Sequence, residues 1–129
     1  MVRRLSSRLA LLLVTSFFVV IGGTSAAYAG DTAECVSVGG IQRGCITHID
    51  DGDDFKVCDT HVDDHGVYGA VQEWINGAWV TRDSVVDGGD PTCGYFHFDV
   101  TIESWDAYRL KICWPSESPW TCDYDNFRE

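Results

Sequence analysis

Residues 67–83 read VYGAVQEWINGAWVTRD, and this stretch predicts a β-hairpin. The first arm, Val67–Ile75, is rich in β-branched and aromatic residues, which favour strands. It ends at Asn76-Gly77, a pair typical of the type I′ turn because both central residues of that turn need a positive φ. We therefore expect the chain to return as a second strand over Ala78–Asp83.

The rest of the chain outside its N-terminal segment shows period-two alternation and no sustained helical periodicity. In Tyr95–Ile102, for example, apolar residues at even positions alternate with mostly polar residues at odd positions. Further strands are predicted over Ile46–Ile49, Phe55–Asp59, Tyr95–Ile102, Ala107–Trp114 and Trp120–Phe127. The predicted fold is all-β: a small disulfide-stapled β-sandwich, Ig-like or jelly-roll-like, of about six or seven short strands, with a small barrel as the alternative.

The N-terminal segment predicts an export signal. Arg3, Arg4 and Arg8 precede an apolar run over Leu9–Ile21, which is too short for a membrane anchor, and Ala27-Tyr28-Ala29 has the form of a cleavage site. We expect residues 1–29 to be a signal peptide and residues 30–129 to be one secreted, extracellular domain.

The charge balance restricts the partners. The chain carries 20 acidic and nine basic residues, a net charge of −11. Removing residues 1–29 takes away three arginines and no acid, so the mature net charge is −14. Such a surface repels phosphates and anionic lipids, so we expect neither nucleic acid nor a membrane as partner after cleavage.

All six cysteines lie in the mature part, which predicts three disulfides in an oxidising compartment. Fifteen pairings are formally possible. We predict Cys35 with Cys45 and Cys113 with Cys122, because these pairs close short loops. Cys58 then pairs with Cys93 and ties two distant strands together. A zinc site is less favoured, since no C-x2-C motif is present.

The acidic turn Asp50-Asp51-Gly52-Asp53-Asp54 raises a calcium hypothesis, because Ca²⁺ takes six to eight oxygen ligands. Asp50, Asp51, Asp53 and Asp54 are the candidate ligands, although their spacing is not that of an EF-hand loop. The alternative is a plain turn in an acidic protein. His61 and His65 are four residues apart, a spacing that on a helix would place two zinc ligands on one face. The turn composition around them favours a solvated loop instead.

No motif predicts catalysis. The G-x-S-x-G nucleophile elbow is absent and the thiols are expected to be oxidised. A pair of carboxylates of the glycosidase type is not excluded by residue type, but a 100-residue sandwich offers little room for a cleft that would desolvate one of them. We expect a protein that is not an enzyme and needs no cofactor.

The segment between Cys35 and Cys45 is the most distinctive local feature. Residues 30–45 are predicted to form an N-terminal disulfide loop that presents Ile41, Gln42 and Arg43. A loop closed by a disulfide is already ordered before it binds, and Arg43 would suit the acidic S1 pocket of a trypsin-like protease. The alternative is an ordinary disulfide loop with an exposed arginine.

Five tryptophans are the other lead. Trp74 and Trp79 flank the Asn-Gly turn, and Trp105, Trp114 and Trp120 lie in or beside predicted loops. Exposed rings of this kind hold sugars in carbohydrate-binding sandwiches, but aromatic residues also fill small cores. We expect at least three of the five to be core residues.

Several short motifs resemble small secreted actinobacterial proteins that carry disulfides and are mostly of unknown function. The motifs are Asp54-x-x-Val57-Cys58-Asp59-Thr60, Gly66-Val67-x-Gly69, Asp87-Gly88-Gly89-Asp90-x-x-Cys93 and Tyr108-x-x-x-Ile112-Cys113-Trp114. In size and export the chain is also similar to the small adaptor subunit of umbrella toxin particles, which bridges a toxin-bearing stalk and a lectin subunit.

We therefore expect a non-catalytic secreted adaptor that binds an extracellular protein partner, as a component of a toxin or antagonism complex. The first alternative is an inhibitor of trypsin-like proteases that acts through Arg43. The second alternative is a calcium-stabilised or glycan-binding module.

Overall fold

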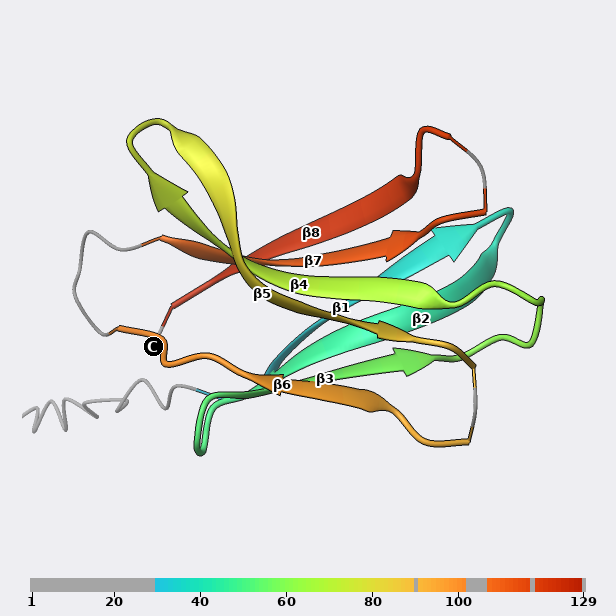
Figure 1. Cartoon of the computed structure of the whole chain (residues 1–129), viewed down its shortest axis with the longest axis horizontal. Coiled ribbons are helices and arrows are strands. Elements are labelled where there is room, and N and C mark those ends of the chain that lie inside the picture. Colours follow the sequence, from blue (N-terminus) through green and yellow to red (C-terminus); the bar gives the residue numbers. More distant parts are fainter. Residues whose placement is uncertain (1–29, 90, 102–106, 117, 129) are drawn as a thin grey trace, which may run out of the picture.

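The computed structural model describes residues 30–89, 91–101, 107–116 and 118–128, and these residues form two antiparallel four-stranded sheets (Figure 1). One sheet has the order β1-β2-β3-β6 and the other the order β5-β4-β7-β8. The strands are β1 (Thr32–Val38), β2 (Ile41–Ile49), β3 (Asp54–Asp59), β4 (Val67–Ile75), β5 (Ala78–Asp87), β6 (Gly94–His97), β7 (Tyr108–Trp114) and β8 (Thr121–Phe127). The predicted all-β sandwich is confirmed. The predicted signal peptide, residues 1–29, lies outside the described residues.

The strands differ from prediction at the N-terminus and at β6. Residues 32–38, predicted as part of a loop, form β1, and β2 begins at Ile41 rather than at Ile46. The turn between them needs a positive φ at both Gly39 and Gly40, which glycine adopts without strain. The strand predicted over Tyr95–Ile102 ends at His97 as β6, and Ile102 lies outside the described residues. The described residues therefore form eight strands rather than six or seven.

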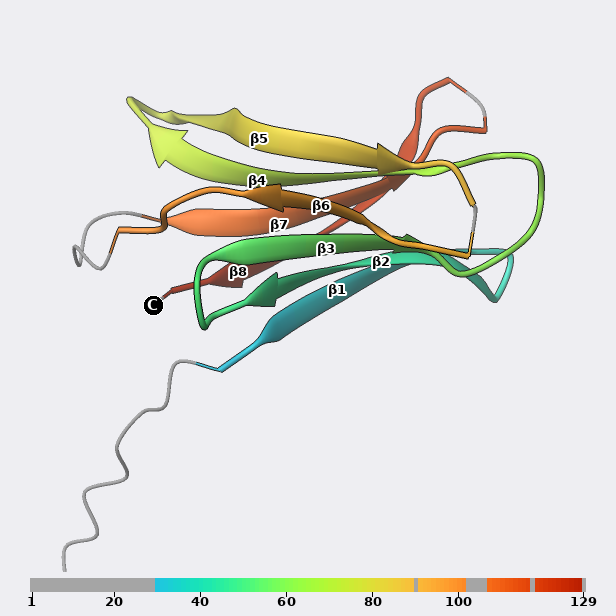
Figure 2. The ribbon, with the colours of Figure 1, turned by 60° about the horizontal axis from the view of Figure 1, so that its bottom comes forward.

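The strand order departs from the immunoglobulin arrangement. β1, β2 and β3 are neighbours in one sheet, whereas an immunoglobulin domain places its third strand in the opposite sheet. The chain then crosses between the sheets after β3, after β5 and after β6. Figure 2 shows that the start of β1 and the end of β8 lie at the same end of the sandwich, near the β2–β3 turn.

The core lies between the two sheets and follows the alternation of the strands, because successive side chains point to opposite faces. Its aromatic members lie at the end that carries the β2–β3 turn, where Phe55 packs against Phe96 and Phe127. The buried core consists of Val36, Ile46, Phe55, Val57, Val67, Val71, Val100, Tyr108, Leu110, Ile112 and Phe127.

Three glycines bring the two sheets unusually close together. Each is opposite a valine of the other sheet: Gly44 opposite Val67, Gly69 opposite Val57, and Gly94 opposite Val85. A Cβ at Gly44 would lie 2.6 Å from Val67 Cγ1, and one at Gly94 would lie 3.0 Å from Val85 Cγ2. A Cβ at Gly69 would overlap Val57 still more severely. The valine methyl groups therefore occupy the space that any larger side chain would need.

The three predicted disulfides are confirmed: Cys35–Cys45, Cys58–Cys93 and Cys113–Cys122. Two of them join residues directly opposite each other in hairpins, on β1/β2 and on β7/β8. The third ties β3 to the residue before β6 across a sequence separation of 35. Three disulfides and no free cysteine among the described residues are compatible with an oxidising, extracellular compartment. The described residues also contain no helix that is long and apolar enough to cross a bilayer.

The contact between Gly69 and Val57 predicts a severe effect of a single methyl group. We expect Gly69→Ala to lower the free energy of unfolding by about 2 kcal/mol or more, because it overpacks the space between the sheets. Gly88→Ala is the control, since nothing lies within 4 Å of the Cβ it would add. Urea unfolding of both variants measures the difference.

A second variant separates overpacking from a backbone effect. We expect Val57→Ala to make room for the added methyl group, so that the double variant loses less stability than the two single variants together. If Gly69→Ala were as stable as Gly88→Ala, the interlocking of the sheets would be disproved.

Candidate binding face

The structure places the predicted binding residues Ile41, Gln42 and Arg43 in β2 rather than in a loop. Ile41 is exposed, and the Gln42 amide donates to Thr60 Oγ1. Arg43 is the extra residue of a β-bulge, because Val36 pairs with Gly44 while Ser37 pairs with Gln42. A bulge redirects a side chain, and here it directs the guanidinium inward from the strand.

The Arg43 guanidinium is held by the β3–β4 connection and by β7. Its Nη1 lies 2.6 Å from Asp63 Oδ2, and its carbon lies 4.5 Å from the centre of the Trp114 ring. The Trp114 indole N–H donates to the same carboxylate oxygen at 3.0 Å. Only 14% of the Arg43 side chain and 13% of the Asp63 side chain are exposed. Arg43 therefore fastens the β3–β4 connection to the sandwich, and a protease pocket could take it only by breaking these contacts.

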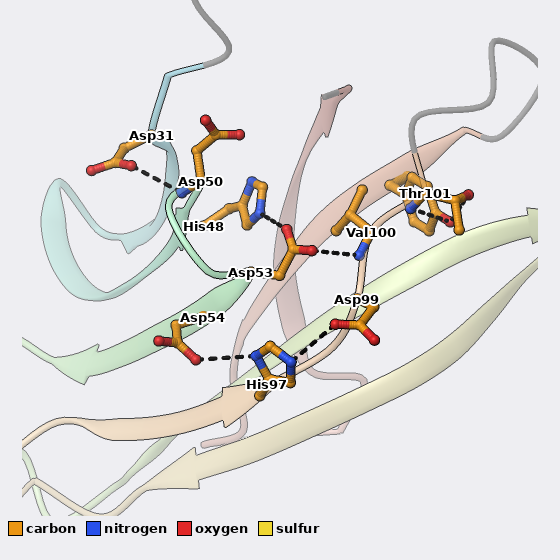
Figure 3. A network of polar contacts seen from close by, with 10 residues as sticks. Asp31, His48, Asp50, Asp53, Asp54, His97, Asp99, Val100 and Thr101 are labelled. Atoms are coloured by element: carbon orange, nitrogen blue, oxygen red, sulfur yellow. Dashed lines mark hydrogen bonds and ion pairs between the residues drawn. The ribbon is translucent and has the colours of Figure 1, made fainter.

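Two carboxylates of the acidic turn between β2 and β3, those of Asp53 and Asp54, contact other residues of the chain (Figure 3). Asp53 Oδ1 lies 3.2 Å from His48 Nε2, and Asp53 Oδ2 accepts the Val100 backbone N–H at 3.0 Å. The neighbouring Asp54 carboxylate points to the opposite side and contacts His97.

The four candidate calcium ligands Asp50, Asp51, Asp53 and Asp54 therefore do not converge. Asp50 is tied through its backbone N–H, which donates to Asp31 Oδ1. No three His, Cys, Asp or Glu side chains group as metal ligands in the part of the chain that the structure describes.

The two histidines of this turn region have different surroundings. His48 is 1% exposed and stacks between Phe55 and Phe127, with ring-centre distances of 4.8 and 4.6 Å. His97 is exposed, and its two ring nitrogens lie 3.3 Å from Asp54 Oδ1 and 3.1 Å from Asp99 Oδ1. Both ring nitrogens of His97 are thus engaged by carboxylates.

His61 and His65 lie in the β3–β4 connection, which is a loop as expected. The His65 ring packs edge-on against Trp114 at 5.6 Å. A shallow pocket of about 110 Å³ is lined here by Asp59, Val62, Asp63, Asp64, His65, Gly88 and Gly89. It is smaller than the pockets that usually bind small molecules.

The tryptophans contradict the prediction that at least three of the five are core residues. Trp74 and Trp120 are 46% and 51% exposed, and Trp79 does not belong to the core. Of the described tryptophans, only Trp114 packs against the core, and Trp105 lies outside the described residues. Trp74 has the same parity along β4 as Tyr68 and the opposite parity to Val67 and Val71, a signal in the sequence that would have placed it on the outer face.

These exposed rings belong to one continuous surface on the outer side of the sheet β5-β4-β7-β8. Rings and cations alternate across all four strands. We call this surface the aromatic–cationic face, and it consists of Tyr68, Trp74, Trp79, Arg109, Lys111, Trp120 and Tyr124.

Arg109 stands at the centre of the aromatic–cationic face. Its guanidinium carbon lies 4.3 Å from the centre of the Trp79 ring and 4.2 Å from that of Tyr124. Its Nε donates to Gln72 Oε1 at 2.8 Å, and the Gln72 amide donates to Thr81 Oγ1 at 3.0 Å. Burial lowers the pKa of Arg109, although an arginine remains protonated at neutral pH.

The two ends of the face continue this pattern. Lys111 Nζ lies 5.8 Å from the ring centre of Tyr68 and 6.0 Å from that of Tyr124. Tyr68 in turn lies 5.8 Å from Trp120, and at the other end Trp74 meets Trp79 at 5.3 Å. The face is therefore a packed layer of side chains that is ordered before any ligand arrives.

Comparison with protein-family models, curated proteins and solved structures finds no match to this chain. The function is therefore inferred from the geometry of the described residues.

The Arg43 contacts predict a stability effect with a defined pH dependence. Burial raises the pKa of Asp63, but the hydrogen bonds from Arg43, the His65 backbone and Trp114, together with the Arg43 charge, outweigh it and lower this pKa below its usual 3.8. The ionised carboxylate therefore stabilises the fold above pH 3.8, and this stabilisation is lost as the pH falls through the folded-state pKa.

We expect Arg43→Ala to lower the free energy of unfolding by about 2 kcal/mol at pH 7, because it leaves the Asp63 carboxylate without its charged partner. Arg82→Ala is the matched control, because its ion pair with Glu73 at 3.5 Å is more exposed. Asp63→Asn should be less stable than wild type at pH 7, and the difference should shrink as the pH falls below 3.8. Urea midpoints measured against pH test this, and a difference that is independent of pH would contradict it.

The environment of His97 predicts a raised pKa. The hydrogen bond to Asp54 raises it most, desolvation opposes this, and Asp99 raises it further, so the pKa lies above 6.5. Protonated His97 therefore stabilises the fold below pH 6.5, and this stabilisation is lost as the pH rises through the folded-state pKa. An NMR titration of the imidazole should show this pKa, and Asp54→Asn should lower it. A pKa that is unchanged in Asp54→Asn would show that the contact does not exist in solution.

Proposed function

We propose that the mature chain is a non-catalytic secreted adaptor that binds an extracellular protein through its aromatic–cationic face. The observation that carries this proposal is the surface of packed aromatic rings and cations on the outer side of one sheet. Trp, Tyr and Arg are the residues most enriched among those that dominate the energy of protein–protein interfaces. This surface replaces the segment 41–43 as the proposed binding site.

The order within the face supports a binding role. Its rings and cations already pack against one another, and three of its rings, those of Trp74, Trp120 and Tyr124, are 45% to 51% exposed. Side chains that are ordered in the free protein lose less conformational entropy on binding, which favours affinity.

The alternative of a trypsin-like protease inhibitor has less support. An arginine that enters an S1 pocket must extend away from its own protein, whereas Arg43 is buried against Trp114 and paired with Asp63. Inhibition of trypsin by the folded chain, with loss of that inhibition in an Arg43→Ala variant that still folds, would restore this alternative.

A glycan ligand is the second candidate, and the exposed rings of Trp74 and Trp120 favour it. Sugars stack on ring faces that are open to solvent. Arg109 occupies one face of both Trp79 and Tyr124, so these two rings are less suited to a sugar. The protein partner is therefore preferred.

The test is affinity capture with variants of the face. The oxidised mature chain, tagged at its C-terminus, is incubated with the culture supernatant of the producing organism, and retained proteins are identified. We expect wild type to retain a stoichiometric secreted protein and Trp120→Ser/Tyr124→Ser to retain at least about tenfold less of it. Tyr95→Ser is the matched control, because Tyr95 is a 59% exposed ring on the other sheet.

The outcomes separate the hypotheses. Equal retention by wild type and the double variant would move the binding site elsewhere, and a loss in Tyr95→Ser would move it to the other sheet. A wild-type chain that retains no protein would contradict the adaptor function and favour a glycan ligand. Near-ultraviolet circular dichroism of each variant confirms that the fold is intact.

A further inference from the structure

We propose that the aromatic–cationic face recognises an extended acidic segment of a partner polypeptide, with Arg109 and Lys111 pairing with carboxylates on alternate residues. This inference rests on the proposed function and names the chemistry of the partner at the same surface.

Charge is segregated on this face. Register and alternation place 14 strand positions of the sheet on its outer side, and none of them is acidic. Two of them, Arg109 and Lys111, are basic, in a chain with 20 acidic and nine basic residues. The positions are Tyr68, Ala70, Gln72, Trp74, Trp79, Thr81, Ser84, Val86, Arg109, Lys111, Cys113, Cys122, Tyr124 and Asn126.

Neither cation forms an ion pair with any described residue, although Arg43, Arg82 and two histidines do. In an acidic protein a carboxylate is the most abundant available partner. Its absence around both cations leaves a positive charge that a partner can neutralise.

The geometry of Arg109 suits a carboxylate. Two rings hold its guanidinium, and Gln72 fixes its Nε, so its two terminal amino groups are left for an incoming ligand. These groups form the planar fork that binds a carboxylate through two parallel hydrogen bonds. Partial burial among rings strengthens such a bond relative to one in water.

The spacing of the two cations indicates the form of the segment. Arg109 and Lys111 are two residues apart on β7, so their side chains leave the same face about 7 Å apart. Residues i and i+2 of an extended peptide have the same spacing. An extended segment with acidic side chains on alternate residues therefore matches both cations at once.

A second copy of this chain fits the face poorly. A symmetric dimer places the same patch on both subunits, so here each side of the interface would carry two cations and no acidic strand position to pair with them. The nearest acidic positions of β8, Asp123 and Asp125, alternate with Tyr124 and so lie on the opposite side of the strand. Exposed charges more than about 8 Å away are largely screened at physiological ionic strength.

The experiment uses the oxidised mature chain, labelled with ¹⁵N, in 150 mM salt. The probes are a capped octapeptide of alternating Glu and Thr, its Gln–Thr counterpart, and a peptide of four Glu followed by four Thr. Chemical shifts of the Arg109 Nε–H and of the Trp79 indole N–H report on the face. We expect the Glu–Thr peptide to shift both signals and to bind at least about fivefold more tightly than either of the other peptides.

Variants assign the binding to the two cations. Arg109→Gln should weaken binding of the Glu–Thr peptide at least about tenfold, and Lys111→Gln should weaken it about threefold. Arg82→Gln is the control and should bind as wild type does, because Arg82 contacts Phe98 and Glu73 rather than the face. If Arg109→Gln does not fold, the Lys111→Gln variant and the comparison of the three peptides still test the proposal.

Equal binding of the Glu–Thr and Gln–Thr peptides, or a wild-type affinity in Lys111→Gln, would overturn the inference. So would a heparin hexasaccharide that shifts the two signals when the Glu–Thr peptide does not, since this would identify an anionic glycan as the ligand. Capture of a protein through the face without binding of the acidic peptide would overturn this inference and leave the proposed function intact. Failure of the capture experiment would count against the proposed function itself.

Discussion

The close approach of the two sheets at three glycine–valine pairs constrains the rest of the structure. Where Gly44, Gly69 and Gly94 meet valines of the opposite sheet, no larger side chain fits between the layers. The large rings of the core, such as Phe55 and Phe127, therefore gather at the end that carries the β2–β3 turn. Most of the described tryptophans have no place inside and lie on the outer surface instead.

Polar contacts at the two ends of the sandwich fasten the connections between strands. Asp53 links the β2–β3 turn to His48 and to the segment that follows β6, and Arg43 links the β3–β4 connection to β7. A buried carboxylate or guanidinium is stable only with partners, so these groups serve the fold. Asp53 and Arg43, two of the charged residues that stand out in the sequence as candidate site residues, are therefore used structurally, whereas the less conspicuous Arg109 has no carboxylate partner among the described residues.

Two of the three disulfides join neighbouring strands within a sheet. Cys35–Cys45 and Cys113–Cys122 connect hairpin neighbours, so they hold strand pairs in register. The Cys113–Cys122 bond lies in the sheet that carries the aromatic–cationic face and stabilises the strands that present Arg109, Lys111 and Tyr124. This sheet therefore presents the rings and cations of the aromatic–cationic face in a defined pattern.

The sequence alone predicted the fold class, seven of the eight strands of the described residues in approximate position, and the observed disulfides as the preferred one of fifteen possible pairings. These follow from local rules: alternation of side chains, the Asn76-Gly77 turn and the short loops that two of the cysteine pairs close. Only the tertiary structure decided which sheet each strand joins, because crossings between sheets leave no local signal. It also decided the roles of the arginines. The bulge at Arg43 depends on its pairing with β1, and the position of Arg109 between Trp79 and Tyr124 depends on three strands that meet from distant parts of the chain.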